Sequence, residues 1–178
     1  MSTSATTGEM RVRAEGPTAS TTPTFWAIVG AVTALDFVTK AIAADRLAPR
    51  HVPHPIIGDV VRFTLAYNPG AAFGMDLGPA SRWIFAALSV LIVVVLLRAT
   101  KDLTRVSRIA AFGVPMVIGG AIGNLLDRIR LRDGVVDFID IGVGDVRFWT
   151  FNVADSAVTV GAICLVLALW RQDQDSSA

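Results

Sequence analysis

Charged residues are scarce in this sequence. Asp, Glu, Lys and Arg make up 17% of the 178 residues, whereas soluble domains carry about 25%. Hydrophobic residues account for 53%, and the mean hydropathy is +0.56. This composition predicts an integral membrane protein that forms one compact bundle. The formal net charge of only +1 argues against a surface for nucleic acid.

Cysteine and histidine are nearly missing as well. Cys164 is the single cysteine, so no intramolecular disulfide can form. The two histidines, His51 and His54, are separated by a stretch with a proline that prevents a helical pair, and no HExxH spacing is present. We therefore expect solvated loop histidines rather than a metal site, and no cofactor.

Four apolar runs dominate the chain, over residues 25–44, 83–97, 109–126 and 153–170. A membrane-spanning helix needs about 20 predominantly apolar residues, so the second run is expected to extend at both ends. Tryptophans lie at or beside the run ends, where an aromatic belt would place them. The pattern predicts an all-α membrane fold, a bundle of four transmembrane helices.

The segments around these runs predict the domain organisation. Residues 1–23 have the composition of a disordered tail, residues 24–172 are expected to form the membrane domain, and 173–178 a short C-terminal tail. The short connection 98–108 carries a dense cluster of basic residues, which favours the cytoplasm. Both termini are then predicted to be cytoplasmic.

The connections on the other side differ from the helices in pattern. Residues 60–67, VVRFTLAY, alternate as a short strand does, and the HVPHP and NPG stretches around them break helices. Residues 145–151, DVRFWTF, have similar strand-like character. We predict a small β element on the extracytoplasmic face of the bundle.

Two charged residues fall within the first run. Asp36 and Lys40 are four residues apart and so share one helix face. Charges at this depth face the bundle interior and have partners. They form either part of a proton path or, as we favour, a mutual ion pair, because opposite charges at this spacing neutralise each other.

The third run carries closely spaced glycines at 119, 120 and 123. Small residues at this spacing allow two membrane helices to approach closely. Such an approach would bring Asn124, Asp127 and Arg128 near a neighbouring helix. These three residues are either an ordinary interfacial polar group or hydrogen-bonded support for a site.

Asp137 and Asp155 lie at the two edges of the segment that joins the last two runs. Two carboxyl groups held close together share one proton, because repulsion and desolvation prevent both from ionising. Such a pair can activate water and protonate a leaving amine, which is peptide hydrolysis without a metal. Spacing alone leaves Asp140 and Asp145 open as alternative partners.

Five motifs together resemble the lipoprotein signal peptidases, the signal peptidase II family. They are LDFVTK (35–40), NPGAAF (68–73), GGAIGNLLDR (119–128), GVVDF (134–138) and FNVAD (151–155). The motifs occur in the family's order along the four apolar runs. The N-terminal tail and the C-terminal residues lie outside the resemblance.

The resemblance implies roles for ten residues. Asp137 and Asp155 are the implied catalytic aspartates. The implied substrate-contacting or site-ordering residues are Asn68, Gly70, Asn124, Arg128 and Asn152. Structural support is implied for Asp36, Lys40 and Asp127. One departure is Phe37, where the family often has Gln.

The same resemblance implies the substrate and the location. The substrate would be a prolipoprotein carrying a diacylglyceryl-cysteine, cleaved just before that cysteine. The enzyme would be a multi-pass protein of the bacterial cytoplasmic membrane among membrane lipids, with its active site on the extracytoplasmic side. It would be inhibited by globomycin-type cyclic peptides and use no cofactor, and we expect a monomer.

Two other classes of function fit parts of the pattern. A small proton-coupled transporter would explain the membrane charges but not the gathering of polar motifs at one membrane face, since transport sites lie nearer the midplane. A non-catalytic scaffold protein is the second alternative.

Overall fold

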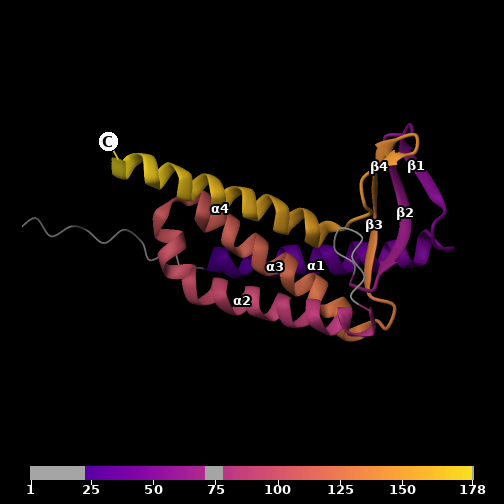
Figure 1. Cartoon of the computed structure of the whole chain (residues 1–178), viewed down its shortest axis with the longest axis horizontal. Helices are drawn as coiled ribbons and strands as arrows, with labels where there is room; N and C mark the ends of the chain where they lie inside the picture. Colours follow the sequence, from indigo (N-terminus) through magenta and orange to yellow (C-terminus); the bar gives the residue numbers. More distant parts are fainter. Residues whose placement is uncertain (1–22, 71–77, 178) are drawn as a thin grey trace, which may run out of the picture.

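Four long helices form the body of the protein, and the computed structural model describes residues 23–70 and 78–177. The helices are α1 (Pro23–Arg46), α2 (Ser81–Val106), α3 (Arg108–Arg130) and α4 (Val153–Ser177). All four are long and apolar enough to cross a membrane. The predicted four-helix membrane fold is therefore confirmed (Figure 1).

The helices extend beyond the apolar runs that predicted them. Hydropathy marks the part of a helix in contact with lipid, whereas backbone hydrogen bonding continues until a capping residue ends it. Ser107 separates α2 from α3, and its side chain accepts a hydrogen bond from the Ala110 N–H. Pro23 begins α1, and residues 1–22 of the predicted tail lie outside the described residues. Helix α4 continues through residues 173–177, which we had set apart as a tail.

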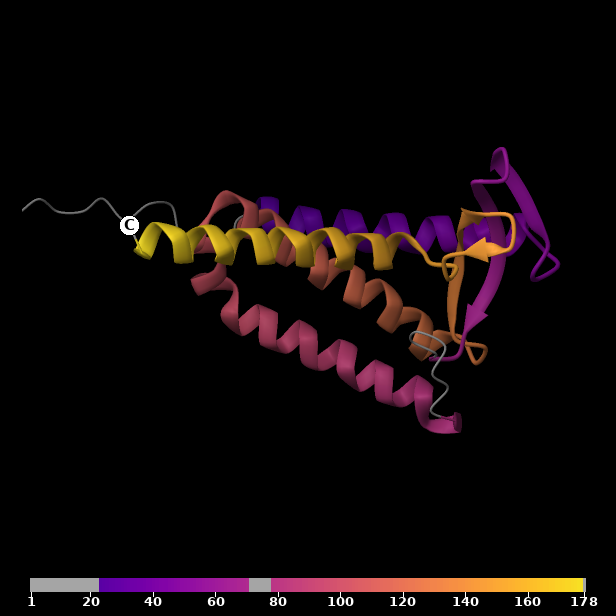
Figure 2. The same ribbon diagram turned by 45° about the horizontal axis from the view of Figure 1, so that its top comes forward.

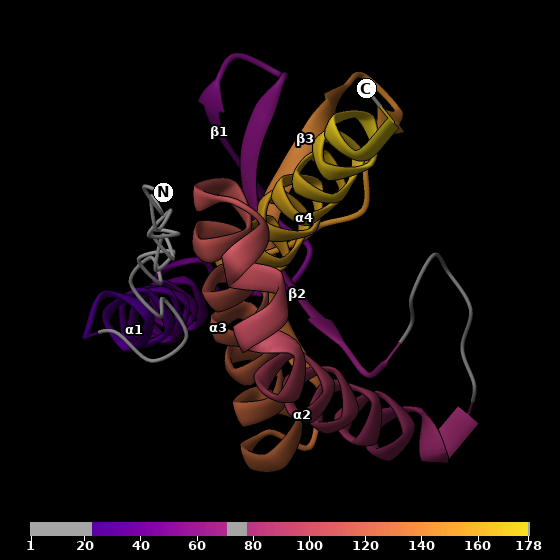
Figure 3. The same ribbon diagram turned by 90° about the vertical axis from the view of Figure 1, so that its left-hand side faces the viewer.

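Helix α3 is the centre of the bundle. It contacts each of the other three helices, and 61% of its most apolar stretch is buried, against 22% or less in α1, α2 and α4. The end-on view places α1, α2 and α4 around it (Figure 3). Val114 and Ile118 of α3 are fully buried and pack with Phe25 and Val29 of α1. Helices α1, α2 and α4 therefore all pack against α3.

Glycines on α3 permit this central position. A Cβ at Gly119 would lie 2.9 Å from the Val32 Cβ of α1, and a Cβ at Gly120 would lie 2.4 Å from the Ala154 carbonyl oxygen of α4. A Cβ at Gly123 would lie 2.5 Å from a carboxylate oxygen of Asp36. Because no side chain fits at these points, α1 and α4 approach the α3 backbone directly.

A four-stranded antiparallel sheet lies at one end of the bundle. Its order is β1 (Pro53–Ile57), β2 (Val61–Asn68), β3 (Val135–Val143) and β4 (Val146–Arg147). The sheet runs crosswise to the helix axes, at the end opposite the C-terminal end of α4 (Figure 1). The predicted β element is therefore present, and β2 matches its prediction within one residue.

Strands β1 and β3 were not predicted, and β4 is shorter than the strand-like stretch that predicted it. Strand β3 is buried over residues 135–138, so its apolar sequence lacks the alternation that marks a half-exposed strand. Strand β1 contains two prolines and lies at the sheet edge, where a missing N–H is tolerated. Strand β4 covers only two residues of the stretch 145–151.

Helix α2 diverges from α1 and α4 toward the end of the bundle that carries the sheet (Figure 2). Its first turn remains attached to α3, because the Arg82 side chain donates to the Arg128 carbonyl and, at 2.9 Å, to the Ile129 carbonyl. One end of the molecule thus brings together the last turn of α3, the first turn of α2, the sheet and the start of α4.

Gly120→Ala is expected to lower the free energy of unfolding by about 1–3 kcal/mol, because the added methyl group forces α4 away from α3. Gly30→Ala is the matched control, since a Cβ there meets nothing within 4 Å. Thermal unfolding of both variants in detergent would measure the difference. Equal stability of the two variants would contradict the close approach of α3 and α4.

Candidate active site

The N-terminus of α4 is closed by two of its own side chains. The Asn152 Oδ1 accepts a hydrogen bond from the Asp155 N–H at 2.9 Å, and the Asp155 Oδ2 accepts one from the Asn152 N–H at 3.2 Å. This reciprocal arrangement is a capping box, in which the cap and the third helical residue satisfy each other's backbone donors. It fixes the Asp155 carboxylate in the first turn of α4.

Strand β3 places the second carboxylate beside this cap. Asp137 is 3% exposed, and its Oδ1 accepts a hydrogen bond from the Asn152 Nδ2 at 2.6 Å. The Asn68 side chain at the end of β2 also hydrogen-bonds Asp137. Asn152 therefore contacts both acids, because it caps the helix that carries Asp155 and donates to Asp137.

Asn124 of α3 fixes the Asp155 carboxylate from the other side. Its Nδ2 donates to the Asp155 Oδ1 at 2.7 Å. Its Oδ1 accepts from the Lys40 Nζ at 2.9 Å and from the Asn152 Nδ2 at 3.1 Å. Because the Asn124 Oδ1 accepts two hydrogen bonds, the side-chain amide of Asn124 has one orientation, in which its Nδ2 faces Asp155.

A buried cluster of charged residues contacts Asn124 and supports the hydrogen bonds of the two asparagines. The Lys40 Nζ lies 2.8 Å from Asp36 and 3.1 Å from Asp127, and all three side chains are at most 3% exposed. Asp36 also accepts from the Ala154 N–H of α4, and Asp127 accepts from the Val136 N–H of β3. Asp36 and Lys40 thus form the mutual pair that we favoured, and Asp127 completes it.

Arg128 reaches the site from the last turns of α3. Its NH1 donates to the Asn124 carbonyl at 3.2 Å, and its guanidinium lies 5.7 Å from the centre of the Phe85 ring. Its buried Nε has no hydrogen-bond partner among the described residues. The bond to the Asn124 carbonyl therefore holds Arg128 beside Asn124 on α3.

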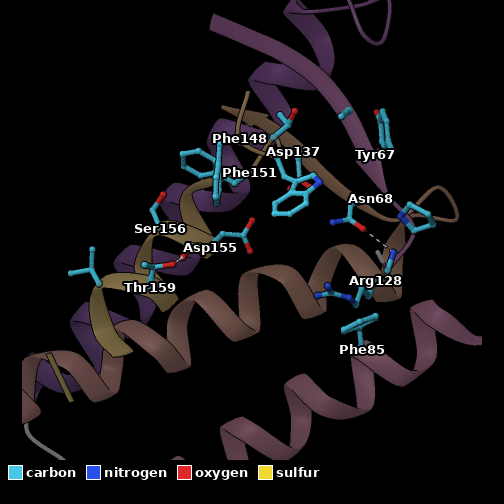
Figure 4. A pocket seen from close by; sticks show the side chains of 16 residues that line it. Tyr67, Asn68, Phe85, Arg128, Asp137, Phe148, Phe151, Asp155, Ser156 and Thr159 are labelled. Atoms are coloured by element: carbon cyan, nitrogen blue, oxygen red, sulfur yellow. Dashed lines mark hydrogen bonds between the residues drawn. The ribbon is translucent and has the colours of Figure 1, made fainter. Parts of the chain in front are cut away.

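Asp137, Asp155 and Arg128 line one cleft of about 770 Å³. Figure 4 shows the two carboxylates and the guanidinium around the same space, with Asn68 beside them. The rest of the lining is largely apolar and includes Tyr67, Phe85, Phe148, Trp149 and Phe151. A few charged groups therefore meet at the base of an apolar cleft, as in sites for small or extended ligands.

Gly70 shapes the rim of this cleft. Its φ of +120° is unfavourable for other residues, and a Cβ there would lie 2.8 Å from the Ser81 Cβ. Its N–H donates to the Asn68 Oδ1 at 3.0 Å (Figure 4). Gly70 thus lets the chain turn tightly enough to hold the Asn68 side chain in place.

The environment of Asp137 favours its protonated form. The pKa of Asp137 is raised from 3.8 to about 7: burial contributes most and the charge of Asp155 adds to it, while hydrogen bonds from Asn152 and Asn68 oppose the rise. Asp137 can therefore hold a proton near neutral pH, as a general acid must.

The structure distinguishes Asp137 from the two alternative acids. Asp140 is three residues further along β3 and so points to the opposite face, where it accepts from Thr64 and Arg147. Asp145 is exposed in the turn before β4. The alternative partners left open by spacing therefore lie away from Asp155.

The remaining predicted residues also have defined positions. Asn68, Gly70, Asn124, Arg128 and Asn152 all line the cleft or hydrogen-bond its carboxylates. The Phe37 ring lies against the Arg130 guanidinium, with 4.5 Å between its centre and the Cζ. Among the described residues, no group of three or more His, Cys, Asp or Glu side chains could hold a metal.

Sequence reasoning missed the aromatic lining of the cleft. Tyr67 is the next-to-last residue of β2, Phe85 lies on α2, and Phe148 to Phe151 lie between β4 and α4. Tyr67, Phe148 and Trp149 lie within three residues of a recognised motif, which is the signal in the sequence that could have identified them. Phe85 lies far from each motif in the sequence, so only the fold brings it to the cleft.

Comparison with known proteins identifies a family model and relatives that match most of this chain. A family model described as signal peptidase (SPase) II matches residues 28–171. A lipoprotein signal peptidase of Mycobacterium avium (strain 104) is 40% identical over 178 residues, covering 91% of this chain and 92% of the relative. One from Geobacillus kaustophilus (strain HTA426) is 40% identical over 146 residues, covering 82% and 92%.

Two solved structures resemble the fold, and both are described as bacterial membrane enzymes. One has a TM-score of 0.74 at 30% identity and covers 85% of this chain and 90% of its own. The other has a TM-score of 0.70 at 32% identity and covers 82% and 92%.

Asp155→Asn is expected to lower the pKa of Asp137 from about 7, because it removes the negative charge that adds to the effect of burial. Titration of the carboxyl carbon of Asp137 by NMR in micelles would measure the shift. Asp140→Asn serves as the control and should leave this pKa in place, since Asp140 lies on the opposite face of β3. An unchanged pKa in Asp155→Asn would show that the two acids do not interact.

Proposed function

The chain belongs to the signal peptidase II family, and we propose that it is an aspartic endopeptidase that removes the signal peptide from diacylglyceryl-modified prolipoproteins. Cleavage would occur just before the lipidated cysteine. The observation that carries this proposal is the convergence of Asp137 and Asp155 on one cleft, both hydrogen-bonded within the same asparagine network.

The two acids have environments suited to different steps. Asp155 accepts hydrogen bonds at both carboxylate oxygens from groups that can only donate, the Asn124 Nδ2 and the Asn152 N–H. Those bonds fix the carboxylate at the cleft, so Asp155 is our proposed base. Asp137, whose pKa is raised to about 7, is the proposed acid.

Hydrolysis then needs only groups of this chain and water. Asp155 takes a proton from the water as the water oxygen attacks the scissile carbonyl carbon. Asp137 gives its proton to the leaving amine nitrogen as the C–N bond breaks, and the proton held by Asp155 then passes to Asp137, which restores the starting state. Arg128 lines the cleft, so its guanidinium can stabilise the negative charge on the carbonyl oxygen.

The cleft also suits a substrate held in the membrane. Its acids lie where the helix ends meet the sheet, so a lipid-anchored peptide can reach them without leaving the bilayer. The cleft continues along α4 past Ser156, Thr159 and Val160 toward the lipid-facing part of that helix. We propose that the acyl chains of the diacylglyceryl group lie along the α4 side of the cleft. Globomycin-type cyclic peptides are proposed to occupy the same cleft.

The active site is proposed to face the extracytoplasmic side of the bacterial cytoplasmic membrane. The sheet and the start of α4 lie at the end of the bundle opposite the α2–α3 connection (Figure 1), and they carry Asp137 and Asp155. That connection carries the dense basic cluster that favours the cytoplasm. A signal peptide translocated across the membrane would then present its cleavage site to the cleft.

Asp137→Asn and Asp155→Asn are each expected to lower cleavage of a diacylglyceryl-modified prolipoprotein by at least about 10²- to 10⁴-fold, the range for a lost general acid or base. A gel-shift assay in detergent would measure this, with a chelator present and absent. Asp145→Asn is the matched control, because Asp145 is exposed in the hairpin turn. Full cleavage by either folded dyad variant would overturn the assignment of the acids.

The pH dependence follows from the raised pKa of Asp137. Below about pH 7 Asp137 keeps its proton, and above it the proton is lost. The cleavage rate is therefore expected to fall as the pH rises through about 7, measured as kcat/KM, which reports the ionisation of the free enzyme. A rate that stays constant or rises above this pH would contradict the role of Asp137 as the acid.

A further inference from the structure

An ionic network that takes no part in the proposed chemistry lies at the far end of the sheet. Arg147 of β4 is its centre, with a side chain only 17% exposed within an otherwise exposed hairpin. Its Nε donates to the Asp140 Oδ1 at 2.5 Å, and its NH2 donates to the Asp140 carbonyl at 3.3 Å. Its NH1 donates to the carbonyl of Asp59 at 3.0 Å.

The partners of Arg147 are themselves held in place. The second carboxylate oxygen of Asp140 accepts from the Thr64 hydroxyl of β2 at 3.0 Å. The Asp59 carboxylate pairs with Arg62 and accepts from the Gly144 N–H at 2.7 Å. The guanidinium therefore joins β3, β4 and the β1–β2 turn, in the planar, multi-donor manner that suits arginine.

Arg147 immediately precedes one side of the active-site cleft. Residues 148–151, here called the cleft wall, connect β4 to the cap of α4, and all four line the cleft. Figure 4 shows Phe148 and Phe151 beside the space in front of Asp155. The Phe148 ring contacts both Trp149 and Phe151 edge to face, with ring centres 5.9 Å apart in each pair.

Backbone pairing supports the two ends of the cleft wall unequally. Strand β4 has two paired residues, Val146 with Val143 and Arg147 with Gly142. Beyond them, Phe148 donates to the Ile141 carbonyl, and Phe151 donates to the Ile139 carbonyl and accepts from the Phe138 and Ile139 N–H groups. Strand β3 thus holds the end of the wall at Phe151, whereas the end at Phe148 follows a strand of only two residues, where the side-chain network of Arg147 adds support.

We propose that Arg147 is a positioning residue that holds the cleft wall at a fixed distance from the acids and thereby sets how tightly the cleft grips its substrate. This inference rests on the proposed peptidase function only for the identity of that substrate. Arg147 acts through residues 148–151, and the hydrogen bonds of Asp137 and Asp155 involve none of its partners. Its loss should therefore weaken substrate binding and leave the chemical step intact.

Two readouts on Arg147→Gln test this inference. The first is kinetic: KM for the diacylglyceryl-modified prolipoprotein should rise roughly tenfold, with kcat within about twofold of wild type, as expected for lost binding in the ground state. Arg147→Lys keeps the positive charge but loses the planar group with several N–H donors. It should therefore raise KM as well, by less than Arg147→Gln does. Arg132→Gln, at an exposed arginine between α3 and β3, is the matched control and should match wild type.

The second readout needs no substrate. A nitroxide spin label at Val146→Cys, a site 83% exposed, in a Cys164→Ala background reports the motion of the hairpin. The label should be more mobile with Arg147→Gln than without it, and unchanged with Arg132→Gln.

The combined outcomes separate the two proposals. Raised mobility with a raised KM and a preserved kcat supports the inference. Unchanged mobility overturns it, and so does raised mobility with an unchanged KM or a fall in kcat alone. If the wild-type enzyme cleaves no prolipoprotein, the peptidase proposal fails, and the label's mobility alone decides whether Arg147 holds the wall.

Discussion

The ammonium group of Lys40 holds together the elements that form the site. Its three N–H donors meet three partners, Asp36 on its own helix and Asn124 and Asp127 on α3. Through Asp36 the cluster reaches the backbone of α4, and through Asp127 it reaches the backbone of β3. Removing one member of a buried ion pair costs about 3–5 kcal/mol, because the other charge is left without a partner. The relative positions of α1, α3, α4 and β3 therefore depend on this one group.

The same group fixes the orientation of the amides above it. Because Lys40 donates to the Asn124 oxygen, the Asn124 nitrogen must face Asp155. Asn152 then has its own nitrogen available for Asp137 and its oxygen for the helix cap. A chain of fixed donors thus runs from the buried cation to both carboxylates. Preorganised donors of this kind need no rearrangement during a reaction, which is the main electrostatic contribution of an active site.

The glycines of α3 make this chain of contacts possible. The carboxylate of Asp36 lies where a Cβ of residue 123 would be, and the Ala154 carbonyl lies where a Cβ of residue 120 would be. Larger residues would separate α1 and α4 from α3 by more than a hydrogen bond can span. Helix packing and site geometry therefore have the same cause in this protein.

The sequence predicted these features to different degrees. Apolar runs predicted the four helices because a membrane span requires a long uniform stretch, and the motif resemblance predicted which polar residues gather at one end. The buried strand β3 was not predicted, since residues 135–138 are apolar or hydrogen-bonded on both faces and show no alternation. The partners of Arg147 could not be predicted either. Asp59, Asp140 and Arg147 meet only through the register of the sheet, and no local pattern specifies that register.

Two separate supports thus converge on one cleft. The buried network of Lys40 and the asparagines holds the acids, and the exposed end of the sheet holds the aromatic wall through Arg147. The first support lies among packed helices and admits few substitutions. The second depends on a two-residue strand and one guanidinium near solvent, so its sequence can change without disturbing the acids. In the proposed peptidase, this separation lets the fit of the substrate vary while the chemistry stays the same.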